Sequence, residues 1–392
     1  MPKVFVGMSG GVDSSVSALL LKEQGYDVTG VYMKNWSRDL PGMKCPWAED
    51  LADAKRVAVK LGIPFEVWDF EEAYREKVVE YMLTEFKKGN TPNPDIMCNQ
   101  EIKFKLFYEK AMEMGADFIA TGHYARIIDG RLARAVDENK DQTYFLYRIS
   151  DEALKHTIFP IGEMLKPDVK KLAEKKGLHN AYKKESMGVC FVGEVGMKDF
   201  LKEYIDIQPG EIREIETEKV LGYHEGAVFY TIGQRHGLYI SGNKGEVNDG
   251  MPYYVVKKDL EKNIVYVSKN LNDSHIWTKE LKLKDVLMRT KPAFSSAGLD
   301  FSSTSYAGTR AEPSLRDEPV RSVRNIGVEK SNQNFMLQKK QILVRLRHRA
   351  PLIPAKFDGE TLYFEQEIKR PAAGQSAVLY DGDICLGGGI IE

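Results

Sequence analysis

The sequence predicts an α/β protein that begins with a parallel sheet and continues into regions of short strands. Three observations lead to this class. Strand-like and helix-like segments alternate over the first third of the chain, which is the pattern of βαβ units. After about Gly193 the helical periodicity gives way to short strands. The chain has 392 residues, too many for one core of ordinary size, so we expect two or three domains.

The elements of the first third follow one another in strand–helix order. The expected strands are Val4–Gly7, Val28–Met33, Ile63–Trp68 and Asp117–Thr121, and the expected helices are Ser14–Gln24, Trp47–Leu61, Glu71–Lys88 and Gln100–Met114. Strands joined by helices of this length pair in parallel, and such sheets bind ligands beyond the carboxyl ends of their strands. Asp129-Gly130 predicts a hairpin turn within Ile127–Leu132. Pro167 begins a further helix, which Gly177 ends.

The second half of the chain predicts a small barrel or sandwich. Its expected strands are Val228–Ile232, Tyr253–Lys257, Ile264–Ser268, Ile342–Leu346, Thr361–Glu365, Ser376–Tyr380 and Ile384–Leu386. Residues from about 293 to 334 are rich in Ser, Arg, Glu and Asn and lack regularly spaced apolar side chains. This composition predicts a flexible insertion.

Charge and cysteine content exclude several classes of protein. The formal net charge is −1, which excludes a globally basic nucleic-acid coat but leaves room for a local basic surface. We find no apolar run long enough to cross a membrane and no signal-peptide pattern, so we expect a cytoplasmic protein without a membrane partner. The cysteines, Cys45, Cys98, Cys190 and Cys385, are far apart and form no CxxC pair. They therefore predict one or two reactive thiols rather than a disulfide scaffold or a zinc ribbon.

The strongest local signal is the sequence VFVGMSGGVDSS, from Val4 to Ser15. A strand ends, Ser9-Gly10-Gly11 turns, and a helix begins near Asp13. Backbone amides and the helix N-terminus then face an anion, to which serine hydroxyls add donors. Asp13 cannot attract phosphate directly, but it suits a magnesium ion that bridges phosphates. The loop is neither a Walker A sequence nor GxGxxG.

The SGGVDS sequence resembles the pyrophosphatase loop of the N-type ATP pyrophosphatases. That superfamily includes GMP synthetase, NAD synthetase, argininosuccinate synthetase and several tRNA-modifying enzymes. The resemblance implies ATP as cosubstrate, adenylation of a substrate oxygen and release of pyrophosphate. The loop alone does not choose among these substrates.

Two cysteines have settings that favour reactivity. Cys98 follows Asn93-Pro94-Asp95 and precedes the expected helix, so we expect it at or near a helix N-terminus, which lowers the pKa of a thiol. Lys103 and Lys105 add positive potential. Cys190 lies between small residues that would leave its sulfur accessible. An adenylated oxygen is a good leaving group that a thiolate or persulfide can displace, and a second thiol can take up the sulfur bond that is released. The pair therefore suggests sulfur chemistry, while Cys45 and Cys385 are expected to be structural.

A basic stretch near the C-terminus suggests contact with a phosphate backbone. Arg345, Arg347 and Arg349 alternate, which would place them on one face of a strand. A solvated strand face is the alternative interpretation.

Together the motifs resemble one family, the tRNA-specific 2-thiouridylases (MnmA or TrmU). The matching segments are GMSGGVDSS, VYMKNW, NPDIMCNQEIKF, TGHYAR, KDQTYFLY, SMGVCFVG, FYTIGQRHGL and GQSAVLYDGDICLGGGII. They run from residue 3 to about 290 and resume from about 341. The resemblance implies a doubly wound parallel-sheet nucleotide-binding domain, a small central domain and a C-terminal β-barrel. The expected bounds are 1–200 for the ATP-pyrophosphatase catalytic domain, 201–272 for the central tRNA-contacting domain, and 273–392 for the barrel, with a flexible insertion near 290–340.

The resemblance also implies site residues. The nucleotide would contact Gly7, Met8, Ser9, Gly10, Gly11, Val12, Asp13, Ser14, Met33 and Gly122, with Asp13 on magnesium. The tRNA would contact Asn93, Pro94, Asp95, His123, Lys140, Asp141, Gln142, Arg347, His348 and Gln375. Asp95 is the candidate acid or base, Cys190 the cysteine that receives sulfur as a persulfide, and Cys98 its partner, which attacks directly or resolves through a Cys98–Cys190 disulfide. A cysteine desulfurase or sulfur-relay protein would supply the sulfur.

We therefore expect ATP-dependent 2-thiolation of the wobble uridine of tRNA. Two alternatives stay open at this point. One is an ATP-pyrophosphatase amide ligase that acts on a small molecule, which would need neither the cysteine pair nor an RNA surface. The other is an RNA-binding scaffold with a vestigial nucleotide site, against which the intact loop from Ser9 to Ser14 argues.

Overall fold

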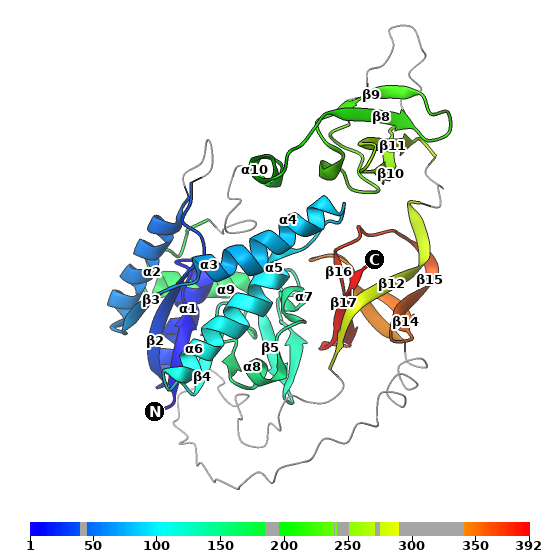
Figure 1. Cartoon of the computed structure of the whole chain (residues 1–392). Helices are drawn as coiled ribbons and strands as arrows, with labels where there is room; N and C mark the ends of the chain where they lie inside the picture. Colours follow the sequence, from blue (N-terminus) through cyan, green and yellow to red (C-terminus); the bar gives the residue numbers. More distant parts are fainter. Residues whose placement is uncertain (40–44, 185–195, 239, 241–250, 271–274, 290–340) are drawn as a thin grey trace.

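Figure 1 shows three groups of elements: a sheet with helices, a small β unit above, and a barrel beside the sheet. The computed structural model describes residues 1–39, 45–184, 196–238, 240, 251–270, 275–289 and 341–392. The expected insertion near 290–340 and Cys190 lie outside these residues. Within them, no helix is long and apolar enough to span a bilayer.

The first group is built on a parallel sheet, as predicted, and a fifth strand, β7, lies beside the four expected strands. The strand order is β3-β2-β1-β4-β7. The strands are β1 (Lys3–Gly7), β2 (Asp27–Lys34), β3 (Phe65–Asp69), β4 (Phe118–Thr121) and β7 (Thr157–Ile158). The order reverses between β1 and β4, and parallel sheets of this kind bind ligands at such a point.

Helices cover both faces of the sheet, which confirms the doubly wound arrangement. On one face, α1 (Val12–Glu23), α2 (Trp47–Leu61) and α9 (Lys166–Lys175) contribute to a core that includes Val4 and Val6. On the other face, Phe5 and Ile119 pack against Phe104 and against Phe107 of α6 (Phe107–Glu113). Neighbouring residues of β1 therefore point into two different cores, as the period of two in a strand requires.

Two long helices lie on this second face; the first has the predicted bounds within one residue, and the second begins earlier than predicted. The first runs through α3 (Glu71–Tyr74), a π segment η1 (Arg75–Val79) and α4 (Glu80–Lys87), and the second through α5 (Pro94–Met97), a π segment η2 (Cys98–Leu106) and α6. The second was predicted to begin at Gln100, but it begins at Pro94. The cause is local: the Asn93 side chain caps the helix by accepting the N–H of Asp95 at 3.1 Å, and proline suits the first turn.

The small β unit is a four-stranded sheet in the order β10-β11-β8-β9. Its strands are β8 (Gly210–Glu214), β9 (Val220–His224), β10 (Tyr254–Asp259) and β11 (Ile264–Ser268). The expected strand Val228–Ile232 is wrong, because Ala227–Phe229 forms a 3-10 turn, η3. The Gln234 side chain then accepts the N–H of Thr231 at 3.0 Å. Local hydrogen bonds thus replace a strand ladder here.

The C-terminal part closes into a six-stranded barrel, as predicted. Its strands are β12 (Trp277–Met288), β13 (Ile342–Arg345), β14 (Ile353–Phe357), β15 (Thr361–Lys369), β16 (Ser376–Asp381) and β17 (Ile384–Ile391), and β12 pairs with both β15 and β17. The hairpin of β5 (Ala125–Ile128) and β6 (Arg131–Arg134) adds to this sheet, since Ala133 pairs with Ile384. Positive φ angles at Asp129 (47°) and Gly130 (68°) confirm the predicted turn.

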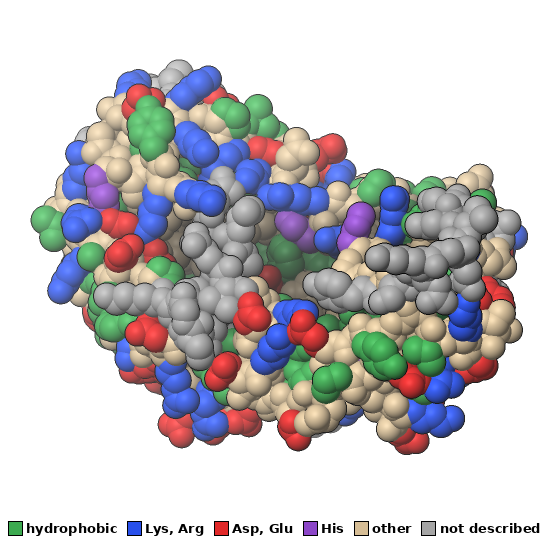
Figure 2. Space-filling view, turned by 90° about the horizontal axis from the view of Figure 1, so that it is seen from above, with side chains coloured by type: hydrophobic (Ala, Val, Ile, Leu, Met, Phe, Trp, Pro, Cys, Tyr) green, Lys and Arg blue, Asp and Glu red, His purple; other side chains and the backbone are tan. Residues whose placement is uncertain are grey.

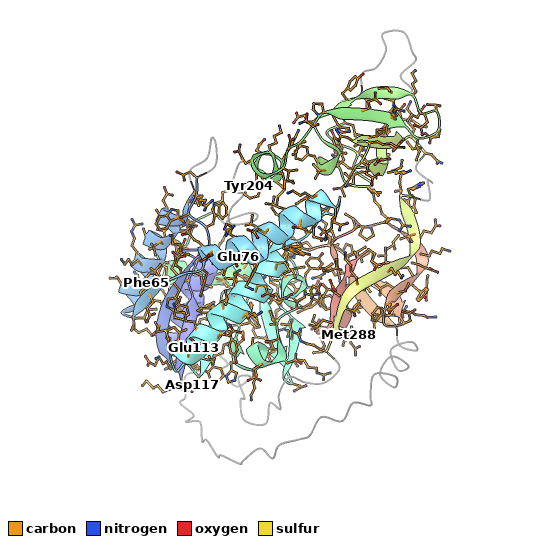
Figure 3. All side chains as sticks on the ribbon, in the orientation of Figure 1. Phe65, Glu76, Glu113, Asp117, Tyr204 and Met288 are labelled. Carbon is orange, nitrogen blue, oxygen red and sulfur yellow. The ribbon has the colours of Figure 1, made fainter. Side chains whose placement is uncertain are left out.

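Three short helices complete the described elements. They are α7 (Thr143–Leu146), α8 (Asp151–Lys155) and α10 (Met197–Tyr204). Phe200 and Leu201 of α10 share a core with Tyr74 and Val78. Figure 3 accordingly shows α10, with its labelled Tyr204, above the helix that carries Glu76. The segment that follows the first group is therefore packed onto that group.

Candidate nucleotide and tRNA site

The predicted phosphate loop lies at the carboxyl end of β1. Gly11 is the N-cap of α1 in an extended conformation, and among the residues that the structure describes no side chain caps this helix. The first-turn amides of α1 are therefore available to an anion. Gly10 has a φ of 79°, and a Cβ there would lie 2.3 Å from the carbonyl oxygen of Asp50. Only glycine fits this turn.

The other predicted residues of the loop divide into hydroxyl donors and packing residues. The Ser14 hydroxyl accepts the N–H of Ser9 at 3.2 Å and donates to the Gly11 carbonyl oxygen at 3.1 Å. Met8 and Val12 are buried in the core beneath the loop. Their side chains support the loop, in which Ser9 is exposed and Ser14 is buried.

Asp13 is held by two residues that the sequence did not single out. Lys166 at the start of α9 places its Nζ 2.7 Å from both carboxylate oxygens of Asp13. The Tyr124 hydroxyl donates to the same carboxylate at 3.0 Å. Asn180 binds the loop from another side and donates to the Gly10 carbonyl oxygen at 2.8 Å. In the sequence, the only local signal near Lys166 was Pro167, which predicted the start of a helix. No local pattern indicated a role for Asn180.

Gly122 and Met33 lie at the same edge of the sheet as the loop. A Cβ on Gly122 would lie 2.6 Å from the backbone nitrogen of Ser14, so β4 and the loop are in direct backbone contact. A Cβ on Gly7 would lie 2.8 Å from Cε of Met33. The ends of β1, β2 and β4 thus bring these residues together.

His123 follows Gly122 and points into the protein. Its side chain is buried, its Nδ1 lies 2.8 Å from the Thr121 hydroxyl oxygen, and its ring packs on Phe104 with centroids 5.7 Å apart. Burial, followed by the charge of Lys103, holds the pKa of His123 well below 6.5. His123 is therefore neutral at physiological pH, and tRNA could reach it only after a local rearrangement.

Asn93, Pro94 and Asp95 form the first turn of α5. Burial raises the pKa of the Asp95 carboxyl, and the positive charge of Lys103 partly offsets this effect. The Lys103 ammonium influences the pKa of both Asp95 and His123. A carboxyl with a raised pKa suits proton transfer.

Cys98 lies one turn inside the helix, near its N-terminus as expected. It is 4% exposed and belongs to a core with Trp36, Cys45 and Tyr74. The field of a helix terminus falls off within the first turn, so Cys98 receives little of it. The partner thiol Cys190 lies outside the described residues, so the proposed pair stays a prediction.

The segment Lys140-Asp141-Gln142 is tied to both the nucleotide loop and the barrel. The Gln142 side chain accepts the N–H of Tyr124 at 2.9 Å. Asp141 is buried and accepts bonds from Thr143 and from Nη1 of Arg345 at 2.5 Å. Asp141 therefore faces the interior, and it can affect tRNA only through the placement of its neighbours.

The predicted stripe of arginines on one strand face is wrong. Strand β13 ends at Arg345, whose side chain is buried against Asp141. Arg347 and Arg349 follow in an exposed turn, where Arg349 has a φ of 62°. A buried carboxylate therefore withdraws the first arginine from solvent, and only the other two remain on the surface.

His348 and Gln375 both make contacts within the protein. The His348 ring packs on Phe145 with centroids 4.5 Å apart, and burial lowers its pKa to about 4. Gln375 donates from its side-chain amide to the carbonyl oxygen of Thr91 at 2.6 Å. Thr91 is two residues before Asn93, so Gln375 lies close to the segment of α5.

Figure 2 views the molecule from above, the side toward which β1 runs in Figure 1. It shows a hollow with apolar side chains inside it and Lys, Arg and His side chains along its upper border in that view. Among the described residues, no group of three or more His, Cys, Asp or Glu side chains could hold a metal ion. A magnesium ion at Asp13 would thus depend mainly on phosphate oxygens and water for its ligands.

Three family models match the chain in succession. Residues 2–194 match the tRNA methyl transferase HUP domain, residues 198–269 the tRNA methyl transferase PRC-barrel domain, and residues 326–391 the aminomethyltransferase beta-barrel domain. The last match begins inside the region where we expected an insertion. Fold and site together define a tRNA-modifying enzyme with a HUP domain, a PRC-barrel domain and a C-terminal barrel.

Relatives named tRNA-specific 2-thiouridylase MnmA match the whole chain. The relative from Lactiplantibacillus plantarum is 43% identical over 100% of this chain and 95% of its own length. Those from Listeria monocytogenes serovar 1/2a and Bacillus licheniformis are 43% and 42% identical, over 100% of this chain and 94% and 95% of their lengths. The chain belongs to the family of tRNA-specific 2-thiouridylases and is a tRNA-uridine 2-sulfurtransferase. Both alternatives that the sequence left open are thereby set aside.

A solved 4-thiouridine synthetase in complex with RNA and bound ATP shares 16% identity with the chain at a TM-score of 0.33, over 52% of this chain and 50% of that one. At so low a TM-score we draw nothing from this likeness.

Proposed function

We propose that the enzyme activates the 2-carbonyl oxygen of the wobble uridine with ATP and then replaces that oxygen with sulfur from a persulfide on Cys190. The observation that supports this most is the backbone contact between Gly122 and Ser14. It joins the phosphate loop to the segment that carries His123 and Tyr124. ATP bound at the loop would therefore lie beside the segment that carries His123 and Tyr124.

The first step forms an adenylate. The uridine O2 attacks the α-phosphorus of ATP, the bond to the β-phosphate breaks, and pyrophosphate leaves. The proton on N3 must depart as O2 becomes bonded, and we assign its acceptance to the Asp95 carboxyl in its ionised form. The base has to leave the anticodon stack to reach this site.

The residues around Asp13 fit a polyanion with magnesium. Asp13 can supply one carboxylate oxygen to the ion, as magnesium bound to phosphates usually requires. Magnesium would neutralise charge on the phosphates. Lys166 is paired with Asp13 at 2.7 Å. As pyrophosphate forms, the Lys166 ammonium would bind its negative charge, while Tyr124 would keep the Asp13 carboxylate oriented.

The second step transfers sulfur. The terminal sulfur of the Cys190 persulfide attacks C2, and AMP departs with the former carbonyl oxygen. The Cys98 thiolate then attacks the Cys190 sulfur, which forms a Cys98–Cys190 disulfide and leaves 2-thiouridine. A thiol reductant must open that disulfide, and a cysteine desulfurase or sulfur-relay protein must renew the persulfide.

The test is mass spectrometry of nucleosides from tRNA incubated with the enzyme, ATP, magnesium and a persulfide donor. We expect one 2-thiouridine at the wobble position for each pyrophosphate released. Cys190→Ser should abolish the product while ATP still binds. Thiolation that proceeds without ATP, or that survives Cys190→Ser, would refute the mechanism.

A further inference from the structure

The segment between α4 and α5, which belongs to the first domain, is held by both the central sheet and the barrel. From the central sheet, Nζ of Lys258 in β10 donates to the carbonyl oxygen of Gly89 at 2.8 Å. From the barrel, the carbonyl oxygen of Ala373 accepts the N–H of Thr91 at 2.7 Å. Residues 89–91, with Lys258 and the barrel residues 373–375, are called the 89–91 clamp below.

The barrel side of the clamp leaves no free space. Gln375 binds the Thr91 carbonyl oxygen, so both backbone groups of Thr91 are bonded to the barrel. Gly374 has a φ of 88°, and a Cβ there would lie 2.9 Å from Cβ of Asn90 and 3.0 Å from the backbone nitrogen of Thr91. A larger residue at this position would push the segment away.

On the side of the central domain, the polar contact of the clamp comes from the half-buried ammonium of Lys258. Lys258 contacts the carbonyl that follows the end of α4, where a positive charge is favourable. Burial lowers the pKa of Lys258 to about 8, so placing the charge there is costly. Leu260 packs on the same turn, since its Cδ1 would lie 2.7 Å from a Cβ on Gly89. An apolar side chain at position 258 would avoid the cost of burying a charge. It could not, however, donate a hydrogen bond to the Gly89 carbonyl oxygen.

We propose that Lys258 is a positioning residue for thiolation. By fixing residues 89–91 from the central domain, it sets the place of α5, and with it Asn93 and Asp95, relative to the nucleotide loop. This inference rests on the proposed role of Asn93 and Asp95 in receiving the uridine. It assigns to the central domain a function in catalysis beyond contact with tRNA.

The test compares Lys258→Met with Lys369→Met in the full-length enzyme. Lys369 is a matched control, because its Nζ donates to the Gly233 carbonyl oxygen at 3.0 Å and so also joins the barrel to the central domain, without touching the clamp. For Lys258→Met we expect kcat for thiolation to fall at least about tenfold, as small misplacements of reacting groups do. The KM for ATP, and the KM for tRNA at each salt concentration, should stay within about twofold of wild type.

Two further measurements make the result decisive. Lys258→Met loses one hydrogen bond to a part-buried carbonyl but also the cost of burying a charge, so it should fold with a melting temperature within a few degrees of that of wild type. Gly374→Ala, which displaces the segment from the barrel side, should produce the same selective fall in kcat. The inference is overturned if Lys258→Met leaves kcat unchanged, or if Lys258→Met acts through the KM for tRNA with a shallower salt dependence, as loss of a phosphate contact would. A wild-type enzyme that forms no 2-thiouridine would instead count against the proposed function.

Discussion

Gly122→Ala should disable ATP activation without unfolding the enzyme. The added Cβ would lie 2.6 Å from the backbone nitrogen and 3.0 Å from Cα of Ser14, and 2.8 Å from the backbone carbon of Asp13. These are backbone atoms and cannot swing aside, so β4 and the phosphate loop must separate by about 0.8 Å to regain ordinary contact. Strain of this kind costs about 1–3 kcal/mol of stability.

The catalytic cost should exceed the structural one. A displacement near 1 Å between reacting groups can lower a rate about 100-fold, so we expect pyrophosphate release to fall by about 10- to 100-fold. The assay is tRNA-dependent pyrophosphate release at saturating ATP, with urea denaturation in parallel. Gly115→Ala is the control: it forces alanine into a φ of 78° with no atom within 4 Å, at the other end of β4. It should cost about 1–2 kcal/mol and leave turnover intact. A Gly122→Ala enzyme with turnover within twofold of wild type would refute this reasoning.

Three further predictions concern buried groups. Arg345→Met leaves the carboxylate of Asp141 buried without its cation, so the free energy of unfolding in urea should fall by about 3 kcal/mol; a loss below about 1 kcal/mol would show that the pair matters little. The pKa of His123 in the folded protein lies well below its unfolded value near 6.5. As pH falls below 6.5, only the unfolded chain binds this proton, so the free energy of unfolding should drop by about 1.4 kcal/mol at pH 5.5. His123→Asn should remove this contribution. Burial raises the pKa of Cys385 to about 11, so iodoacetamide at pH 8 should leave it unlabelled in the native enzyme, and mass spectrometry of tryptic peptides checks this.

Local features of the sequence predicted most of the first domain and its phosphate loop. The turn at Gly10 and the hairpin at Asp129-Gly130 depend on neighbours in the chain, and both formed as expected. The start of α5 was missed by six residues because the capping role of Asn93 was not considered. Strand β8 has the sequence GEIRE and β9 the sequence VLGYH. Neither shows the continuous apolar pattern that would have predicted it.

The remaining site contacts join residues that are remote in sequence. Lys166 meets Asp13 across 153 positions, and Arg345 meets Asp141 across 204. In each case a charged side chain is buried because a partner from another element neutralises it, which no local periodicity records. For the same reason, alternation alone placed Arg345 on the surface, where the folded chain does not put it.

The most direct test of the proposed chemistry follows the oxygen that sulfur replaces. A tRNA carrying 18O at the 2-carbonyl of the wobble uridine is incubated with the enzyme, ATP, magnesium and a persulfide donor. Mass spectrometry then measures the 18O content of the released AMP. We expect each 2-thiouridine formed to transfer one 18O atom to the phosphate of AMP. Unlabelled AMP formed in step with 2-thiouridine would contradict the account, because the carbonyl oxygen would then leave without ever having been bonded to phosphorus.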